Sequence, residues 1–290
     1  MTTIAGVGTC QWTGGCAERE TMARNSTPPS SLIISIDVEL MRVADADQPA
    51  RISLVDHRSR IASLQQLLEL FQEAQVPATW GFSDPASSQF VPELIDESSM
   101  HEVALLGDAS WISLEKGRRG FCQQLVQRLA DARRVGCELS TLALYDGQLR
   151  DDFDLLAKHQ ISMVRQPGRK RRSGKDTPRH RTLRYGLWEA PRATLVSPST
   201  RAWFRRSKMI VNRAIRRTIR HGGIGHIGLD LTAGQYASPS VLDFVARVLE
   251  TVNKHRRDDQ LEVCTLRELA TRWRPRQQVV SARSLLRVAA

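Results

Sequence analysis

SLIISIDVE, residues Ser31 to Glu39, is the stretch that decides the fold of this chain. Its aliphatic, β-branched run is typical of a strand buried on both faces, as in a parallel sheet covered by helices. The run ends in two carboxylates, Asp37 and Glu39. Proteins built from alternating strands and helices place their chemistry at the carboxyl ends of the strands. We therefore expect a functional site around Asp37, because a carboxylate that closes a buried strand needs a partner or a task.

Strands and helices alternate along the rest of the chain. Short apolar runs predict strands, and apolar residues at helical spacing predict helices. The predicted strands are 32–36, 78–82, 101–106, 139–144, 161–164, 187–190, 224–231 and 261–264. The predicted helices are 61–71, 90–96, 121–132, 153–156, 200–220, 238–252 and 265–273. Ser238 and Thr265 are the expected N-caps of the last two helices. Seven or eight strand–helix units predict an α/β fold whose parallel sheet closes into a barrel.

The two ends of the chain differ from this alternating region. Residues 1–30 are rich in Gly, Thr, Ser and Pro without sustained periodicity, which predicts a disordered leader. Met22 is an alternative to Met1 as the true start. Residues 31–273 are expected to form one domain, and residues 274–290 a loose basic tail.

The chain carries a net charge of +11, which invites a polyanionic partner. Its five cysteines are odd in number and contain no CxxC pair, which argues against a zinc knuckle or a disulfide framework. This cysteine usage favours a reducing, cytoplasmic compartment. The sequence shows no secretory signal and no apolar run near the roughly 20 residues that span a bilayer. The oligomeric state is left open.

Four stretches follow one another in the order of a known family's motifs. They are ISIDVE (34–39), VPATWGF (76–82), HEVALLGDAS (101–110) and GIGHIGLDL (223–231), the last followed by LEVCTLREL (261–269). In these stretches the chain resembles the polysaccharide deacetylase family, also called the NodB-homology family, over roughly residues 31–273. The resemblance implies a distorted, TIM-like (β/α)7-8 barrel. It also implies a carbohydrate-active hydrolase that removes N- or O-acyl groups from a glycan, acting on carbon–nitrogen bonds other than peptide bonds.

In the family that this chain resembles, an aspartate and two histidines hold a divalent metal that polarises the acyl carbonyl and activates water. A second aspartate is the base, and a later histidine is the general acid. Asp37 falls on the base position of this pattern. The metal-binding aspartate falls on Val38, although related branches carry the acid at the place of Glu39. Arg165 falls where the family has an arginine that orients a catalytic aspartate, so we expect it to pair with Asp37.

The chain departs from the family pattern at three other positions. The metal histidines would fall on Leu106 and Ser110, and the acid histidine on Asp230. Leucine has no donor atom, serine is a poor ligand for a transition metal, and an ionised carboxylate is a poor proton donor. We therefore expect a degenerate catalytic site, as in a pseudoenzyme, with no cofactor. A zinc-type divalent metal is expected only if the site has been rebuilt.

The candidate site has three parts. The catalytic candidates are Asp37, Asp230 and Arg165. The substrate-binding candidates are Glu39, Trp80, Trp111 and Trp188. The weak metal candidates are Glu39, Asp108 and His226. For Asp108 and His226 we favour a structural role, the first as a turn cap and the second as a core histidine.

Two basic segments and one glycine pattern complete the sequence signals. The insert 165–184 carries nine cations that could grip phosphates or acidic sugars, although an exposed disordered insert is favoured. The basic helix 200–220 is expected to pack on the core rather than on a membrane or nucleic acid. Gly223, Gly225 and Gly228 spell GxGxxG, but the pattern follows a helix and enters a strand, so we interpret it as a tight turn rather than a dinucleotide site.

The expected function is therefore that of a carbohydrate-active protein of the deacetylase type with a degenerate site. The expected partner is a glycan or a small molecule that contains a sugar. The alternative is a non-catalytic protein that binds a glycan, or a polyanion through the basic loop, on the same fold.

Overall fold

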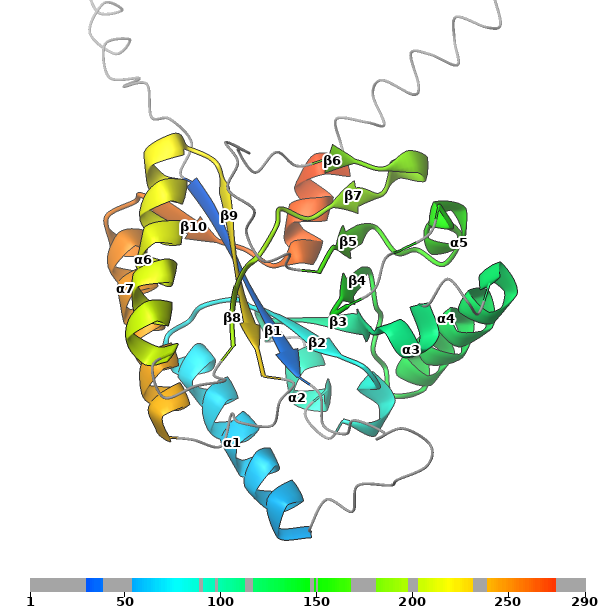
Figure 1. Ribbon diagram of the computed structural model, residues 1–290, viewed down its shortest axis with the longest axis horizontal. Helices are drawn as coiled ribbons and strands as arrows, with labels where there is room; N and C mark the ends of the chain where they lie inside the picture. Colours follow the sequence, from blue (N-terminus) through cyan, green and yellow to red (C-terminus); the bar gives the residue numbers. More distant parts are fainter. Residues whose placement is uncertain are drawn as a thin grey trace, which may run out of the picture.

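The computed structural model describes residues 30–38, 54–88, 91–96, 99–112, 117–146, 149, 151–167, 181–197, 203–231 and 239–274. Figure 1 shows a curled sheet with helices on its outer side. Most of the basic insert, Glu39, the expected cap Ser238 and the predicted leader and tail lie outside the described residues, except that Ser30 begins β1 and Arg274 ends the last helix. Among the described helices, none is both long and apolar enough to cross a membrane.

Ten strands form the sheet in the order β6-β7-β5-β4-β3-β2-β1-β9-β8, and β10 also pairs with β1. Their bounds are β1 Ser30–Val38, β2 Thr79–Phe82, β3 Glu102–Gly107, β4 Thr141–Leu144, β5 Met163–Arg165, β6 Arg181–Thr182, β7 Trp188–Glu189, β8 Thr194–Val196, β9 Ile224–Asp230 and β10 Leu261–Val263. All pairs are parallel except β6 with β7. The curled parallel sheet confirms the predicted distorted (β/α)7-8 barrel.

Every predicted strand is present, and β1 is buried along its length as expected, with only Ser31 partly exposed. The prediction missed β6 and β8, which have two and three residues and form the two ends of the sheet. Such short edge strands carry no recognisable alternation in the sequence, because too few residues repeat.

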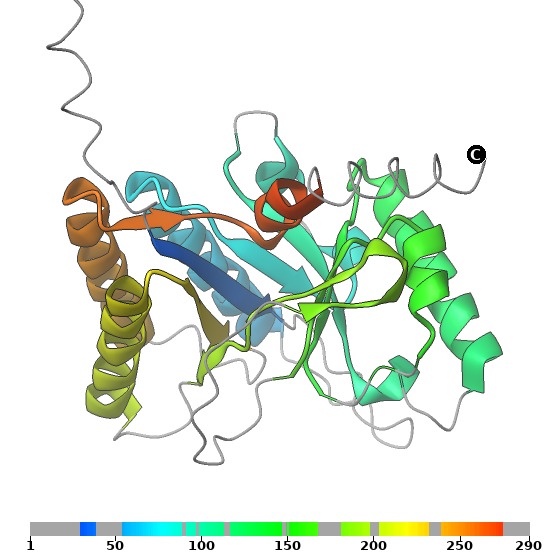
Figure 2. The same ribbon diagram turned by 90° about the horizontal axis from the view of Figure 1, so that it is seen from above.

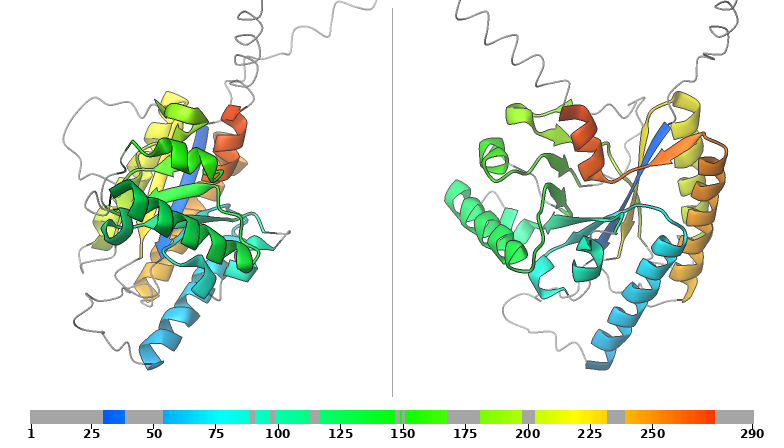
Figure 3. Two further views of the ribbon diagram at one scale, coloured as in Figure 1. Left: turned by 90° about the vertical axis from the view of Figure 1, so that its right-hand side faces the viewer. Right: turned by 180° about the vertical axis from the view of Figure 1, so that it is seen from behind.

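The helices lie on the outer side of the sheet. Their bounds are α1 Leu54–Glu73, α2 Val91–Ile95, α3 Ala109–Ile112, α4 Gly117–Arg134, α5 Phe153–Lys158, α6 Trp203–His221 and α7 Pro239–Arg257, with short 3-10 turns at η1 Pro85–Ser87 and η3 Arg184–Gly186. Figures 2 and 3 show α1, α6 and α7 on one flank and α4 and α5 on the other. A last helix, 266–274, follows β10. The prediction missed α3, a single turn.

Alternate residues of β1 enter two different cores. Ile34 and Ile36 belong to the larger cluster, which includes residues of α1, α6 and α7. Ile33 points to the barrel interior and belongs to a smaller cluster with Met163 and Trp188, which includes residues of the helix 266–274. Because side chains alternate across a strand, the next inward positions of β1 after Ile33 are Ser35 and Asp37. The interior is thus apolar at the amino end of β1 and polar at its carboxyl end.

The helix 266–274 is tied to the amino ends of the strands. Thr265 and Glu268 form a reciprocal capping box, which confirms Thr265 as the N-cap. The buried carboxylate of Glu102 accepts hydrogen bonds from the hydroxyls of Thr79 and Thr141 and from the backbone N–H of Arg267. One side chain therefore joins β2, β3 and β4 to the last helix.

The glycines of GIGHIG serve packing rather than a cofactor. Gly222, just before the motif, ends α6 with a φ of +59°, a left-handed conformation that glycine adopts without strain. A Cβ on Gly225 would lie 2.1 Å from Oγ1 of Thr218, so the absence of a side chain lets α6 approach β9. This agrees with the interpretation of GIGHIG as a turn between a helix and a strand.

Candidate functional site

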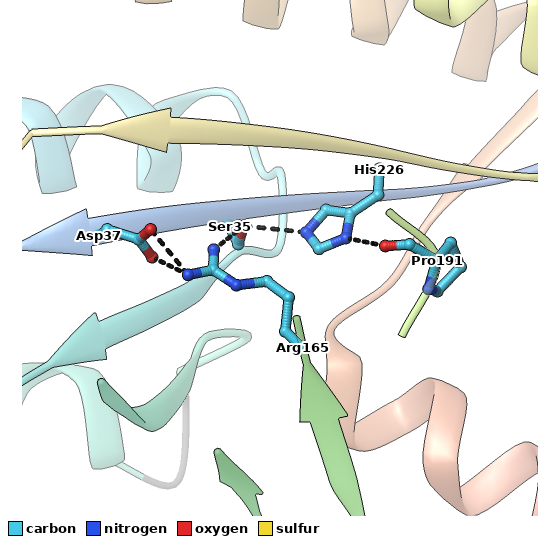
Figure 4. Close-up of polar contacts among 5 residues, drawn as sticks. All are labelled: Ser35, Asp37, Arg165, Pro191 and His226. Atoms are coloured by element: carbon cyan, nitrogen blue, oxygen red, sulfur yellow. Dashed lines mark hydrogen bonds and ion pairs between the residues drawn. The ribbon is translucent and has the colours of Figure 1, made fainter. Parts of the chain in front are cut away.

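An ion pair between β1 and β5 lies inside the barrel (Figure 4). Nη2 of Arg165 donates to both carboxylate oxygens of Asp37, at 2.6 and 2.7 Å. Both side chains are buried, with Arg165 2% exposed and Asp37 3% exposed. Arg165 closes β5 as Asp37 nearly closes β1, so the two charges meet toward the carboxyl ends of the strands. The predicted pairing of Arg165 with Asp37 is confirmed.

A chain of hydrogen bonds continues from Arg165 toward the amino end of the barrel. Nη1 of Arg165 donates to Oγ of Ser35 at 2.8 Å, and Oγ of Ser35 lies 2.9 Å from Nε2 of His226. Nδ1 of His226 lies 2.8 Å from the carbonyl oxygen of Pro191. Because a carbonyl oxygen can only accept, the proton of His226 sits on Nδ1, and Nε2 accepts from the hydroxyl of Ser35. All hydrogen bonds of the chain then run in one direction.

Burial controls the protonation of this cluster. Burial, and then the charge of Arg165, lower the pKa of His226 to about 3, while the bond to Pro191 opposes this shift. His226 is therefore neutral at physiological pH. Burial raises the pKa of Asp37, the Arg165 guanidinium opposes that effect, and the nearby carboxylate of Asp230 adds to it. Asp37 is thus a stronger base than an ordinary aspartate.

Asp230 lies beside Asp37 on the neighbouring strand. The two residues are register partners in the parallel pair of β1 and β9. Both line a narrow pocket, together with Leu144, Tyr145, Arg165, Gln166, Ala193 and Leu195. The volume of this pocket is about 10 Å³, which corresponds to about one water molecule. The three catalytic candidates therefore share one pocket, as the sequence predicted for their positions.

The tryptophans predicted to bind substrate lie in the packed interior. Trp80 is 2% exposed and packs edge-on against Phe71, and Trp111 is 1% exposed and stacks on Phe121. Trp188 is 7% exposed and lies against Trp273, at the far end of the barrel from Asp37. Side chains this buried offer no surface to a glycan, so we correct the prediction: the three tryptophans are core residues. Glu39, the fourth candidate, lies outside the described residues.

The two metal candidates that the structure describes, Asp108 and His226, have structural roles. Both ring nitrogens of His226 are engaged in hydrogen bonds and the ring is 3% exposed, so it is a core histidine rather than a ligand. The backbone carbonyl of Asp108 accepts from Trp111 and Ile112 in the turn of α3, as expected of a residue that begins a turn.

The described side chains do not fit the divalent metal that the resemblance implies. No group of three or more His, Cys, Asp or Glu side chains in the described part of the chain could hold a metal ion. Leu106, at one of the two histidine positions, is buried and close to Asp37: a Cβ on Gly81 would lie 3.5 Å from Leu106 and 3.3 Å from Asp37. The aliphatic side chain of Leu106 thus lies near Asp37 at a position where the family pattern has a nitrogen donor.

Ser35 and Tyr145 are polar members of this site that were not predicted from the sequence. Ser35 is the link between Arg165 and His226, and Tyr145 lines the pocket. Ser35 carried a usable signal, since it is the single polar residue within the aliphatic run Leu32–Ile36 and stands two positions before Asp37. Tyr145 follows β4 directly, which places it at the carboxyl edge of the sheet.

Comparison with known proteins identifies similar structures but no similar sequence. No family model matches the sequence, and no curated protein matches it. A protein of Mycobacterium smegmatis described as a polysaccharide deacetylase superposes with a TM-score of 0.66 at 12% identity, over 86% of this chain and 92% of that one. A second protein with this description, from Pseudomonas aeruginosa PAO1, superposes with a TM-score of 0.60 at 15% identity, over 84% of this chain and 90% of that one. Puue allantoinase superposes with a TM-score of 0.63 at 13% identity, over 86% of this chain and 92% of that one.

Identities this low establish the architecture and leave the activity to be argued from the residues of this chain. The predicted fold is confirmed by an independent comparison, across most of the length of each protein. The chain has the distorted barrel fold of the polysaccharide deacetylases.

Proposed function

We propose that this protein is a carbohydrate-active hydrolase of the deacetylase type, which removes acyl groups from a glycan without a catalytic metal. The observation that carries this proposal is the buried Asp37, held by Arg165 beside Asp230 at the carboxyl end of the barrel. The solved structures that share the fold include proteins described as polysaccharide deacetylases, which supports an acylated sugar as the substrate class.

Asp37 acts as the general base in this proposal. Its carboxylate takes a proton from a water molecule whose oxygen attacks the acyl carbonyl carbon. As the bond from that carbon to the sugar nitrogen or oxygen breaks, the proton passes from Asp37 to the leaving atom. One carboxyl group therefore serves first as base and then as acid, which needs no histidine at the position of Asp230.

Arg165 and Asp230 adjust this base from opposite directions. The two hydrogen bonds from Arg165 fix the orientation of the Asp37 carboxylate, and its positive charge offsets the negative charge that develops on the attacked carbonyl oxygen. The charge of Asp230 raises the pKa of Asp37 and so strengthens it as a base. The pocket beside Asp37 holds about one water molecule, so the acyl group and the sugar ring bind outside it.

The described cysteines, Cys122, Cys137 and Cys264, are free thiols, which supports a reducing compartment such as the cytoplasm for this activity.

Acetate release from N-acetylated chitooligosaccharides and O-acetylated xylan tests the proposal. The wild-type protein releases acetate, and Asp37→Asn lowers kcat by about 100-fold or more, as for the loss of a general base. Asp243→Asn, in an exposed ion pair on α7, is the matched control and retains full turnover. If neither substrate class releases acetate, or if Asp37→Asn turns over like the wild type, the hydrolytic role is wrong.

A further inference from the structure

Helix α6 has two faces of different character. Its inner face carries Ser207, Val211, Ile215 and Thr218, which are buried, and α6 packs on β9 and β1. This confirms the prediction that the apolar stripe of the helix is a packing surface. The stripe accounts for only part of the apolar residues of α6.

The outer face of α6 exposes two large apolar side chains among cations. Met209 is 66% exposed and Ile210 is 45% exposed, which makes them two of the few large apolar side chains on the described surface. Arg206 precedes them by one turn and Arg213 follows by one turn, and both are exposed. An exposed aliphatic pair between arginines is not explained by packing against the barrel.

Basic residues continue along this face, and α6 itself contains no acidic residue to balance their charge. The sequence of α6 contains Arg205, Arg206, Lys208, Arg213, Arg216, Arg217 and Arg220, and no Asp or Glu. A groove of about 420 Å³ runs between α6 and α7, lined by Asn212, Ile215, Arg216, Glu250, Thr251, Lys254, His255 and Arg257. Glu250 is the single acid among these lining residues. The α6 helix and the adjoining groove thus form one cationic flank.

We propose that the α6 surface, defined by Arg206, Met209, Ile210, Arg213, Arg216 and Arg220, binds the face of an anionic lipid bilayer. Arginines can pair with lipid phosphates while Met209 and Ile210 enter the boundary between headgroups and acyl chains. A nucleic acid backbone would use the arginines but leaves no role for two exposed aliphatic side chains on the same face. The combination of charge and apolar surface therefore favours lipid.

The dimensions of the surface suit this role. From Arg206 to Arg220 the helix rises about 21 Å, so the surface spans several lipid headgroups. Figure 1 shows α6 at the edge of the molecule, beside α7. Because α6 precedes the parallel strand β9, its first turns, with Met209 and Ile210, lie toward the carboxyl end of the sheet. This inference rests on the surface alone and is independent of the proposed hydrolase activity.

Co-sedimentation of the full chain with vesicles tests the proposal. We expect binding to vesicles of phosphatidylcholine with phosphatidylglycerol and little binding to phosphatidylcholine alone. The double variant Arg213→Glu/Arg216→Glu should lower the partition coefficient at least tenfold. Its matched control is Arg119→Glu/Arg133→Glu, which makes the same change in net charge on exposed positions of α4 and should bind like the wild type.

The neutral double variant Met209→Gln/Ile210→Gln separates a lipid partner from a nucleic acid, because it removes the exposed apolar surface and leaves the charge unchanged. It should weaken vesicle binding about tenfold or more and leave any binding of duplex DNA unchanged. Circular dichroism checks that each variant is folded, which is expected because all the substituted residues are exposed. The proposal is overturned if the α4 control loses as much binding as the arginine double variant of α6, if Met209→Gln/Ile210→Gln binds vesicles normally, or if the wild type does not bind anionic vesicles.

Discussion

Both carboxylate oxygens of Asp37 accept hydrogen bonds from a single nitrogen of Arg165. Asp37 is 3% exposed and Arg165 is 2% exposed. This arrangement neutralises a carboxylate in the barrel interior while keeping it at the edge of a pocket. A buried charge without such a partner is costly, so each member of the pair depends on the other. The same two side chains therefore contribute both to the stability of the fold and to the proposed chemistry.

Arg165→Met should strongly destabilise the protein, because it leaves Asp37 buried without a countercharge. Loss of one partner of a buried pair costs about 3–5 kcal/mol in the free energy of unfolding. The double variant Asp37→Asn/Arg165→Met should lose less than Arg165→Met alone, since no unpaired charge remains. Urea denaturation of the wild type, Asp37→Asn, Arg165→Met and the double variant measures the coupling free energy between the two side chains. Losses of unfolding free energy that simply add would contradict an energetically coupled ion pair.

His226 should remain neutral in the folded protein throughout the range from pH 5 to 8. Its folded pKa of about 3 lies below the ordinary value of 6.5, so the unfolded chain takes up the proton first as the pH falls. The stability that it contributes is complete above pH 6.5 and is lost as the pH falls toward 3. At pH 4.5, two units below the ordinary pKa, the loss is about 3 kcal/mol relative to His226→Gln. Nitrogen-15 NMR should show the Nδ1–H tautomer; an imidazolium at pH 6 would contradict the hydrogen-bond chain.

Glu102→Gln should stabilise the protein at neutral pH. Burial raises the pKa of Glu102, opposed by its bonds to Thr141, the N–H of Arg267 and Thr79. A carboxyl group whose pKa is higher in the folded protein than in the unfolded chain contributes its full stability below the ordinary pKa of about 4.5. That contribution is lost as the pH rises through the pKa of the folded protein. The gain from the substitution is about 1.4 kcal/mol per unit of pKa shift.

Urea denaturation from pH 4 to pH 8 measures this effect of Glu102. The advantage of the glutamine variant should grow with pH and vanish near pH 4. The control Glu73→Gln, at the exposed end of α1, should show no such trend. A glutamine variant that is less stable at every pH would show that the carboxylate is needed in its charged form.

Gly225→Ala should destabilise the protein by about 1–3 kcal/mol through overpacking between α6 and β9. The new Cβ would overlap Thr218, whereas a Cβ on Gly223 would meet nothing within 4 Å. Gly223→Ala is therefore the matched control and should change the unfolding free energy by less than about 0.5 kcal/mol. Thermal unfolding compares the two variants, and equal effects would reject the close-approach explanation for the glycine.

The long elements of the fold could be predicted because each repeats its pattern several times. β1 has an unbroken aliphatic run, and α7 shows apolar residues at helical spacing, so both were found within a few residues of their true bounds. The short strands β6 and β8 were missed because two and three residues are too few to show an alternation, and because β8 pairs with β9, which is distant in the sequence. Their residues carry no local preference strong enough to mark a strand.

The site shows the same division between local and long-range information. Asp37 could be identified because it closes its own strand, and the partnership with Arg165 followed from the family resemblance. The hydrogen bond from Ser35 to His226 joins residues 191 positions apart, so no local pattern could reveal it. The tryptophans were misassigned because the sequence gives residue type but does not show which face of an element is covered.

Acetate release by metal-depleted protein tests the central claim most directly. The protein would be treated with a chelator, its metal content measured by elemental analysis, and its turnover compared with and without added zinc, beside Asp37→Asn in both conditions. The account predicts that turnover is the same in the depleted and zinc-loaded protein and that Asp37→Asn lowers it about 100-fold or more in both conditions. Turnover that disappears with the metal and returns in proportion to bound zinc would contradict it.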